Sequence, residues 1–321
     1  MFTWKLWRAL QTPPADHPLF YFVCHTKPLR LQGFITRLAP AGLTALLVAF
    51  AIGIWYAPRL IMPVLFNPTF AAITGLLLFT GTIYGLVWAT SISEIIIRLR
   101  GEGKYDLLVL SPATPLRINW AICTGFLYRN QSFRRISQQR ARITQVLIML
   151  ITILAIPLLL GFVADNDRYM TEVFSTLISI IALTTLLHLD HIQSAVIGTL
   201  IGLNVPLLTH RSADSRLLAG GTFLIFQIAS YLALWVLGFV LLPDLHDHLH
   251  IPLAVQQVSL PISRVLVFFF SREIIILCLW HGLTNLLHER PTEIDLLASY
   301  PTGGASVLDL AAARPPRDRQ V

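Results

Sequence analysis

The stretch "GEGKYDLLVLSPATPLRINW", residues Gly101 to Trp120, interrupts a very apolar chain with charges and helix breakers. Glycines at its start free the backbone, and the residue before Pro112 is disfavoured in the helical conformation. Between these breaks, Lys104–Leu110 has the leucines and the polar residues of a short surface helix. The pattern therefore predicts a short helix whose two ends are both fixed by the sequence.

Longer helices are predicted on both sides of this segment. Thr114 followed by Pro115 matches an N-cap with proline at the first helical position. The residues that then share one helical stripe are Leu116, Trp120, Cys123 and Leu127. Upstream, Glu94 and Arg98 are four residues apart with the acid first, which predicts a stabilising pair within the helix that ends at Gly101.

The composition is typical of an α-helical membrane protein. Hydrophobic residues make up 55% of the 321 residues and charged residues 13%, against about 25% charged in soluble domains. The apolar residues form blocks of about 20, the length of a membrane-spanning helix, whereas outer-membrane strands would alternate. The predicted fold class is all-α, a polytopic integral membrane protein. Its basic net charge of +7 indicates topology and lipid contact rather than nucleic-acid binding.

Six membrane spans are predicted, with a cytoplasmic connector helix between the second and the third. The spans are Ala39–Tyr56, Thr69–Thr90, Ile143–Val163, Val173–Leu189, Leu217–Leu242 and Ile262–Leu286. Six spans put both termini on one side, and all but four of the 24 lysines and arginines lie on that side. The positive-inside rule then predicts a plasma (inner) membrane protein with both termini in the cytoplasm.

The stretch His191–Thr209 is also long and apolar enough to span. Gly198, Gly202, Asn204 and Pro206 form a poor set for a straight helix. A seventh span would move the C-terminus and its arginines outside, against the charge rule. A broken or interfacial segment on the cytoplasmic side is therefore favoured.

Two cytoplasmic segments flank the transmembrane domain, which is predicted over residues 39–286. In residues 1–38, Phe2–Leu10 carries an apolar stripe beside Lys5 and Arg8, which predicts a helix lying in the membrane interface. Residues 287–321 combine Pro, Gly, small residues and mixed charges, which predicts a mostly disordered tail.

The connector resembles that of a known family. "GKYDLLVLSPATPLRINWA" is similar to the cytoplasmic connector of type-2 ABC exporter permeases, which has an acidic, glycine-containing turn, a leucine-rich helix and a Ser-Pro stop. "HPLF", His17–Phe20, resembles the family's opening motif with His in place of Asn. The six-span plan also fits, whereas the basic insert Arg129–Arg142 is longer than the family pattern.

The resemblance implies a permease subunit without its own ATPase domain. A separate ATP-binding subunit would receive the connector through Glu102, Tyr105, Asp106, Leu107, Leu108 and Leu110. A second permease copy, in a homodimer or heterodimer, would complete the path across the membrane. The alternative is a non-transporting membrane scaffold subunit of a larger complex, bound through the basic connector and the tail.

Enzyme chemistry is not predicted. "GEGKY" lacks the GxxxxGK[ST] spacing, with Tyr105 where a Mg²⁺-binding hydroxyl would stand, and the sequence has no HExxH or GxSxG motif. His246, His248 and His250, with aspartates beside them, are competent zinc or copper ligands, but a polar outer loop is the favoured interpretation. No metal, cofactor or nucleotide site is therefore expected.

Two further sets of charged residues are candidate sites. The arginines predicted to contact anionic lipid are Arg129, Arg134, Arg135, Arg140 and Arg142, a run without an acid. Arg272 and Glu273 fall near the middle of the last span, where charges are costly. They line a route or pair with another span, or the span is offset and they lie near an interface. A buried contact predicts that removing Glu273 leaves Arg272 unpaired.

Overall fold

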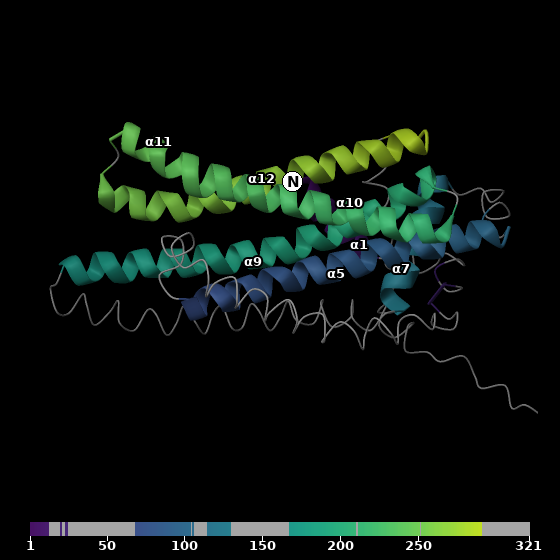
Figure 1. The fold of residues 1–321 in the computed structure, drawn as a ribbon, viewed down its shortest axis with the longest axis horizontal. Coiled ribbons are helices and arrows are strands. Elements are labelled where there is room, and N and C mark those ends of the chain that lie inside the picture. Colours follow the sequence, from purple (N-terminus) through teal and green to yellow (C-terminus); the bar gives the residue numbers. More distant parts are fainter. Residues whose placement is uncertain are drawn as a thin grey trace, which may run out of the picture.

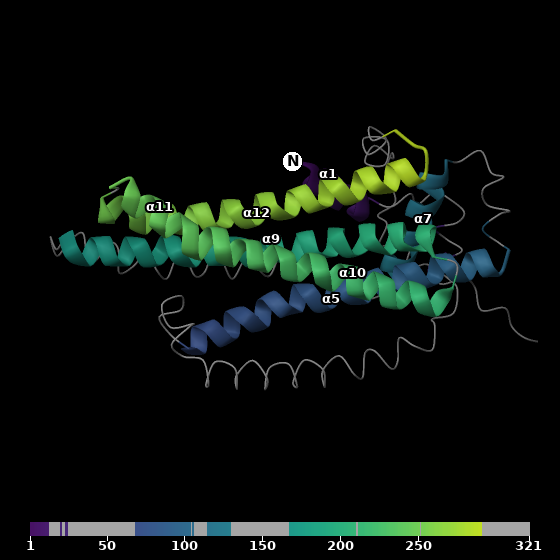
Figure 2. The same ribbon diagram turned by 45° about the horizontal axis from the view of Figure 1, so that its top comes forward.

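The described part of the chain is helical throughout. The computed structural model describes residues 1–12, 20, 23–24, 68–103, 105, 114–129, 167–209, 211–250 and 252–290, and these contain no strand. The longest elements are α5 (Pro68–Gly101), α9 (Asp167–Leu208), α10 (Ser212–Ala233) and α12 (Leu253–Leu286). They lie side by side along the long axis of the molecule in both views (Figures 1 and 2). The predicted all-α class is confirmed.

Three stretches of these helices are long and apolar enough to cross a membrane. They are Gly81–Gly101, Ile181–Leu208 and Asp214–His248. A membrane location follows from them. The predicted spans Ala39–Tyr56 and Ile143–Val163 lie outside the described residues.

The continuity of α9 corrects the expectation for His191–Thr209. α9 runs without interruption from Asp167 to Leu208, so this stretch is not broken. Its glycines are contact positions. A Cβ on Gly198 would lie 2.4 Å from the carbonyl oxygen of Gly85 in α5. Small residues let two helix backbones approach closely, so α9 and α5 pack through the residues that resembled helix breakers.

The last turns of α9 are bonded to both neighbouring helices. Asn204 Nδ2 donates to the carbonyl oxygen of Leu200 in α9, at 2.9 Å, and to that of Leu279 in α12, at 3.0 Å. The carbonyl oxygen of Pro206 accepts from Arg100 Nη1 of α5 at 2.6 Å. The polar residue and the proline near the end of α9 therefore join helices instead of breaking one.

α10 continues into a longer helix and a tight turn. It passes directly into a π-helical segment, η1 (Leu234–Leu241), and then into α11 (Leu242–His248). The chain reverses at Leu249 and His250, where His250 has a φ of 51°, and α12 begins at Leu253. The exposed large side chains along α10 and η1 include Leu217, Ile225, Ile228, Leu232 and Trp235.

At the end of α5, the predicted helix stop is confirmed but the predicted ion pair is not. Gly103 adopts a φ of +68°, a left-handed conformation that glycine adopts without strain, directly after the last turn of α5. The predicted Glu94–Arg98 pair is wrong. Glu94 pairs with Arg216 at the start of α10, and Arg98 pairs with Glu102 at 2.9 Å. Glu94 thereby joins two helices instead of stabilising one.

The helix predicted after the connector is confirmed. α7 spans Pro115–Arg129, and the hydroxyl of Thr114 accepts from the backbone N–H of Arg117 at 3.5 Å, as an N-cap does. All four residues of its predicted stripe are buried.

The N-terminal helix α1 (Phe2–Gln11) packs on protein rather than presenting its apolar face to the interface. Its buried residues are Thr3, Leu6, Trp7, Ala9 and Leu10, whereas Lys5 and Arg8 are exposed. Tyr128 of α7 donates its hydroxyl to the carbonyl oxygen of Gln11 at 2.7 Å, and the ring of Phe2 meets that of Trp280 in α12 edge-on at 5.8 Å. The predicted amphipathic helix therefore exists, but α7 and α12 contact it.

Candidate functional site: a buried polar cluster between four helices

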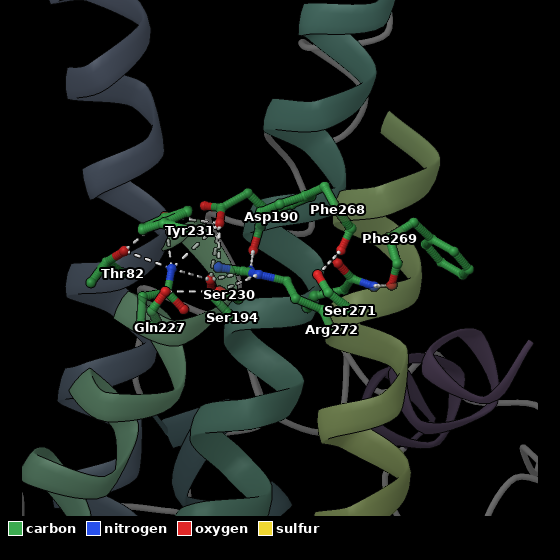
Figure 3. Close-up of polar contacts among 11 residues, drawn as sticks. Thr82, Asp190, Ser194, Gln227, Ser230, Tyr231, Phe268, Phe269, Ser271 and Arg272 are labelled. Atoms are coloured by element: carbon green, nitrogen blue, oxygen red, sulfur yellow. Dashed lines mark hydrogen bonds and ion pairs between the residues drawn. The ribbon is translucent and has the colours of Figure 1, made fainter. Parts of the chain in front are cut away.

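Seven polar side chains from the long helices meet in one buried cluster, drawn in Figure 3. Its members are Thr82 of α5, Asp190 and Ser194 of α9, Gln227, Ser230 and Tyr231 of α10, and Arg272 of α12. We call this group the polar cluster. Arg272 has no exposed surface, and Asp190 and Gln227 are each 1% exposed. Charges in such surroundings persist only when they are paired, so the contacts of Arg272 decide what the cluster does.

Arg272 joins α12 to two other helices. Its Nη2 lies 2.8 Å from Asp190 Oδ1 in α9. Its Nη1 donates to the carbonyl oxygen of Asp190 at 3.1 Å and to Ser194 Oγ at 2.9 Å. Its Nε donates to Ser230 Oγ of α10 at 3.3 Å. One guanidinium thus uses acceptors on α9 and α10 and neutralises the Asp190 carboxylate.

The Asp190 carboxylate is held by a second set of donors. The Tyr231 hydroxyl donates to Asp190 Oδ1 at 3.0 Å. Gln227 Nε2 lies 2.7 Å from the Tyr231 hydroxyl, 2.8 Å from Thr82 Oγ1 and 3.4 Å from Asp190 Oδ1. These contacts bring α5 into the same network, so the polar cluster connects four helices.

Packing encloses both charged groups. The Arg272 guanidinium lies over the ring of Phe268 at 4.5 Å and over that of Tyr231 at 5.3 Å, a favourable placement for a desolvated cation. On the other side, a Cβ on Gly81 of α5 would lie 2.4 Å from Asp190 Oδ2. α5 can therefore approach the carboxylate only because residue 81 is glycine.

Arg272 and Glu273 are neighbours in sequence that bond to different partners. Glu273 Oε1 accepts from the backbone N–H groups of Phe2 and Thr3, the latter at 3.2 Å, and the Thr3 hydroxyl bonds its other oxygen. Glu273 therefore caps the N-terminus of α1, where a carboxylate is favoured by the helix dipole. The expectation that Arg272 depends on Glu273 is wrong, since its charge partner is Asp190.

The two described connector residues, Glu102 and Tyr105, each contact an arginine of α5. Glu102 is exposed and pairs with Arg98. Tyr105 is 7% exposed, and the guanidinium of Arg100 lies 4.6 Å above its ring. Tyr105 is therefore not a free anchor for a partner in this conformation. The other expected coupling residues, Asp106, Leu107, Leu108 and Leu110, lie outside the described residues.

Among the expected lipid contacts, only Arg129 is described. It ends α7, is partly buried and lies over the ring of Phe126 at 5.0 Å. Burial lowers the pKa of its guanidinium. The remaining four, Arg134, Arg135, Arg140 and Arg142, lie outside the described residues.

The histidines expected in an outer loop belong largely to a helix. His246 and His248 lie in α11, and His250 lies in the turn that follows. His246 bonds the carbonyl oxygen of Leu242 at 2.8 Å through Nδ1 and Ser259 Oγ at 2.9 Å through Nε2. Across the described residues, no group of three or more His, Cys, Asp or Glu side chains is placed to hold a metal ion.

The cysteines differ in exposure. Cys123 is buried in α7, Cys278 is exposed on α12, and all three thiols are free. Cys24 is partly exposed, and its thiol contacts the carbonyl oxygen of Gly125 at 3.2 Å. Burial raises the pKa of Cys24 to about 11.

Sequence reasoning found Arg272 but missed its partner. Asp190 follows Val173–Leu189 directly, and it appeared to mark the end of a span. The missed signal was the single carboxylate between two apolar stretches that are each long enough to span. A single acid in such a position indicates one long helix with a buried partner as readily as two segments with water between them.

Comparisons with known proteins identify no relative. No model of a known protein family matches this chain, and neither the curated proteins nor the solved structures contain a significant match. The functional proposal below therefore depends on the residues and geometry described above.

Proposed function

We propose that the chain is the membrane permease subunit of an ABC-type exporter, coupled to a separate ATPase through its cytoplasmic connector. The observation that carries the proposal is the pair of fixed helix ends around the connector. α5 ends at Gly101, the left-handed Gly103 follows it, and α7 begins after the Thr114 cap. Residues 104–113, which resemble the ATPase-docking connector, are the sequence between these two helix ends.

The distribution of charge supports a cytoplasmic position for this connector. Arg98, Arg100, Arg117, Arg211 and Arg216 all lie near the end of α5, the start of α7 or the start of α10. Two contacts join these ends, Arg100 to the end of α9 and Arg216 to Glu94. The opposite end carries α11 with two aspartates, and no lysine or arginine occurs from residue 217 to 263. The positive-inside rule assigns the arginine-rich end to the cytoplasm.

The six-span plan with both termini inside remains part of this proposal. α9 is one helix of 42 residues, about 63 Å long, whereas the hydrocarbon core is about 30 Å thick. α9 therefore crosses once and extends beyond the bilayer, so Val173–Leu189 and residues 191–208 belong to one helix with a single crossing. The charge rule and the length of α9 agree on this assignment.

The polar cluster limits how the helices can move during transport, because it joins α9, α10 and α12. Alternating exposure of a path between two permease copies requires some helices of each copy to move. Separating Asp190 from Arg272 in an apolar interior leaves two uncompensated charges, a cost of about 3–5 kcal/mol for a pair broken at one partner. Movement in which α9 and α12 shift together avoids this cost, so we propose that they move as one unit.

Affinity purification of the tagged full-length chain from its native membrane tests the proposal. The wild type is expected to retain an ATP-binding subunit, identified by mass spectrometry. Leu108→Ala with Leu110→Ala should lose that subunit and still insert into the membrane, because few apolar anchors dominate most interfaces. The matched control is Ile225→Ala, on the exposed face of α10. Absence of an ATPase from the wild type, or its retention by the double variant, would overturn the proposal.

One observation favours the alternative of a membrane scaffold subunit. Tyr105, expected to dock on the ATPase, is instead packed beneath Arg100. A scaffold would copurify with the other membrane subunits of a larger complex in fixed stoichiometry and without an ATPase. The same purification therefore separates the two functions.

A further inference from the structure

Arg264 of α12 is held in a fixed orientation by the π-helical segment η1. Its Nε donates to the carbonyl oxygen of Gly238 at 3.0 Å. Its guanidinium lies over the ring of Phe239 at 4.2 Å. A hydrogen bond and a ring from consecutive residues leave this guanidinium little freedom, so it is preorganised rather than a flexible surface charge.

Gly238 makes this approach possible. A Cβ at this position would lie 3.1 Å from Leu234 Cδ1 and 3.3 Å from Arg264 Cγ, both tighter than ordinary contacts. The same residue lies within η1, and π-helical turns are often found at functional sites. The position of the Arg264 guanidinium therefore depends on a small residue, Gly238, and on the π-helical turn that contains it.

The charge of Arg264 has no protein counterion in the described part of the chain. Its two partners there are a carbonyl oxygen and an aromatic ring, and no described carboxylate lies within ion-pair distance. Arg272, two turns further along α12, is neutralised by Asp190. The Nη groups of Arg264 donate to no described protein atom, and the residue is only partly buried. They can therefore form the paired bonds with which arginine binds phosphate.

The spacing of charged residues along α10 and α11 indicates how far Arg264 lies from the middle of the bilayer. Arg216 and Asp244 are about 28 residues apart, or about 42 Å along a helix, close to the thickness of a bilayer with its headgroups. Ser230 is midway between them. Gly238 is about 12 Å from that midpoint, whereas the hydrocarbon boundary is about 15 Å from it. A long arginine side chain at this level reaches the headgroups.

We propose that Arg264 binds the phosphate group of a phospholipid, in the leaflet at the α11 end of the molecule. The group recognised is a phosphate ester, and a free phosphate anion offers the same oxygens. The depth of Gly238 favours the lipid as the source, because a free ion would have to leave water to reach it. This site lies at the opposite end of the molecule from α7, which ends at Arg129, and it does not depend on the transport proposal.

Lipid binding by the full-length protein in detergent micelles tests the site. Three probes are added separately, and the shift in Tm is measured: phosphatidylethanolamine, diacylglycerol with the same chains, and inorganic phosphate. The wild type should bind phosphatidylethanolamine about tenfold more tightly than Arg264→Gln, the factor for one hydrogen bond to a charged group. Diacylglycerol and inorganic phosphate should not distinguish the two proteins.

Equal binding of phosphatidylethanolamine by the wild type and Arg264→Gln would overturn the proposal. An Arg264-dependent shift as large with inorganic phosphate would also overturn it, since the ligand would then be a free anion. Arg134→Gln with Arg135→Gln should bind the net-neutral lipid as the wild type does. Should the loss occur in that variant instead, the basic run is the lipid site and Arg264 is not.

Two glycine variants, compared with each other, test the proposal even if Arg264→Gln does not fold. Gly238→Ala retains every charge but displaces the guanidinium, so phospholipid binding should weaken. Gly221→Ala, where the new Cβ meets no atom within 4 Å, is the matched control and should bind as the wild type. Equal lipid binding by the two alanine variants would contradict the proposal.

Discussion

α9 and the continuous helix formed by α10, η1 and α11 are both long and apolar, yet they occupy opposite environments. In its most apolar stretch, 83% of α9 is buried, whereas only 22% of the α10–α11 helix is. The buried helix contacts its neighbours through Gly198, Gly202 and Asn204. The exposed helix presents Ile225, Ile228 and other large apolar residues outward.

The difference shows which helix holds the bundle together and which one faces outward. Between membrane helices apolar burial supplies little driving force, because lipid tails are as apolar as leucine. Close backbone contact and polar bonds hold the bundle together instead. α9 supplies both, through its glycines and through Asp190. The less apolar of the two helices is therefore the central one.

The largest expected effect comes from breaking the ion pair at the centre. Asp190→Ala leaves Arg272 buried without a counterion and should destabilise the folded protein by about 3–5 kcal/mol. Replacing both charges, as in Asp190→Leu with Arg272→Met, should recover much of that loss. Thermal unfolding in detergent measures both. Wild-type stability of the single variant would show that the polar cluster does not hold α9 in place.

A smaller effect is expected at the glycine contact between α9 and α5. Gly198→Ala introduces a Cβ 2.4 Å from a backbone oxygen and should cost about 1–3 kcal/mol through forced separation of the helices. Gly221→Ala on the open side of α10 should be neutral, or stabilising by up to about 1 kcal/mol from helix propensity. Thermal unfolding compares them, and equal effects would remove the distinction between the two helices.

The cap on α1 should contribute less. Glu273→Ala removes the acceptor for the first N–H groups of α1 and should cost about 0.5–2 kcal/mol. Its effect should add to that of Asp190→Ala, because Asp190 pairs with Arg272 whereas Glu273 bonds Phe2 and Thr3. A double-mutant cycle measures the coupling. A coupling energy above about 1 kcal/mol would mean that Arg272 responds to Glu273 after all.

The smallest effect concerns reactivity rather than stability. Because the pKa of Cys24 is raised to about 11, its thiolate is scarce near neutral pH. In a variant that retains only this cysteine, alkylation should rise about tenfold per pH unit from about pH 8 to about pH 10 without levelling off. A plateau near pH 9 would show that the thiol is not buried beside Gly125.

The sequence predicted the local elements better than their partners. The Gly103 stop and the Thr114 cap were readable because backbone conformation and capping depend on a few adjacent residues. The partners of Glu94, Arg272 and Glu273 were not, because each lies on a helix distant in sequence. The glycines of α9 were misinterpreted for the same reason. A glycine that breaks a helix and one that packs on another helix look alike until the neighbour is known.

Measuring the depth of α10 in the bilayer tests the central claim most directly. Ser230 of α10 belongs to the polar cluster, so this part of α10 should lie at mid-membrane, with its outer face in lipid. Single cysteines at Ile228 and Leu245, in a variant without native cysteines, would carry a fluorophore in bilayer vesicles. The label at residue 228 should be quenched by lipids brominated near the chain ends and not by iodide in water. The label at 245 should respond to iodide. Quenching of both labels by iodide to the same extent would contradict a mid-membrane polar cluster.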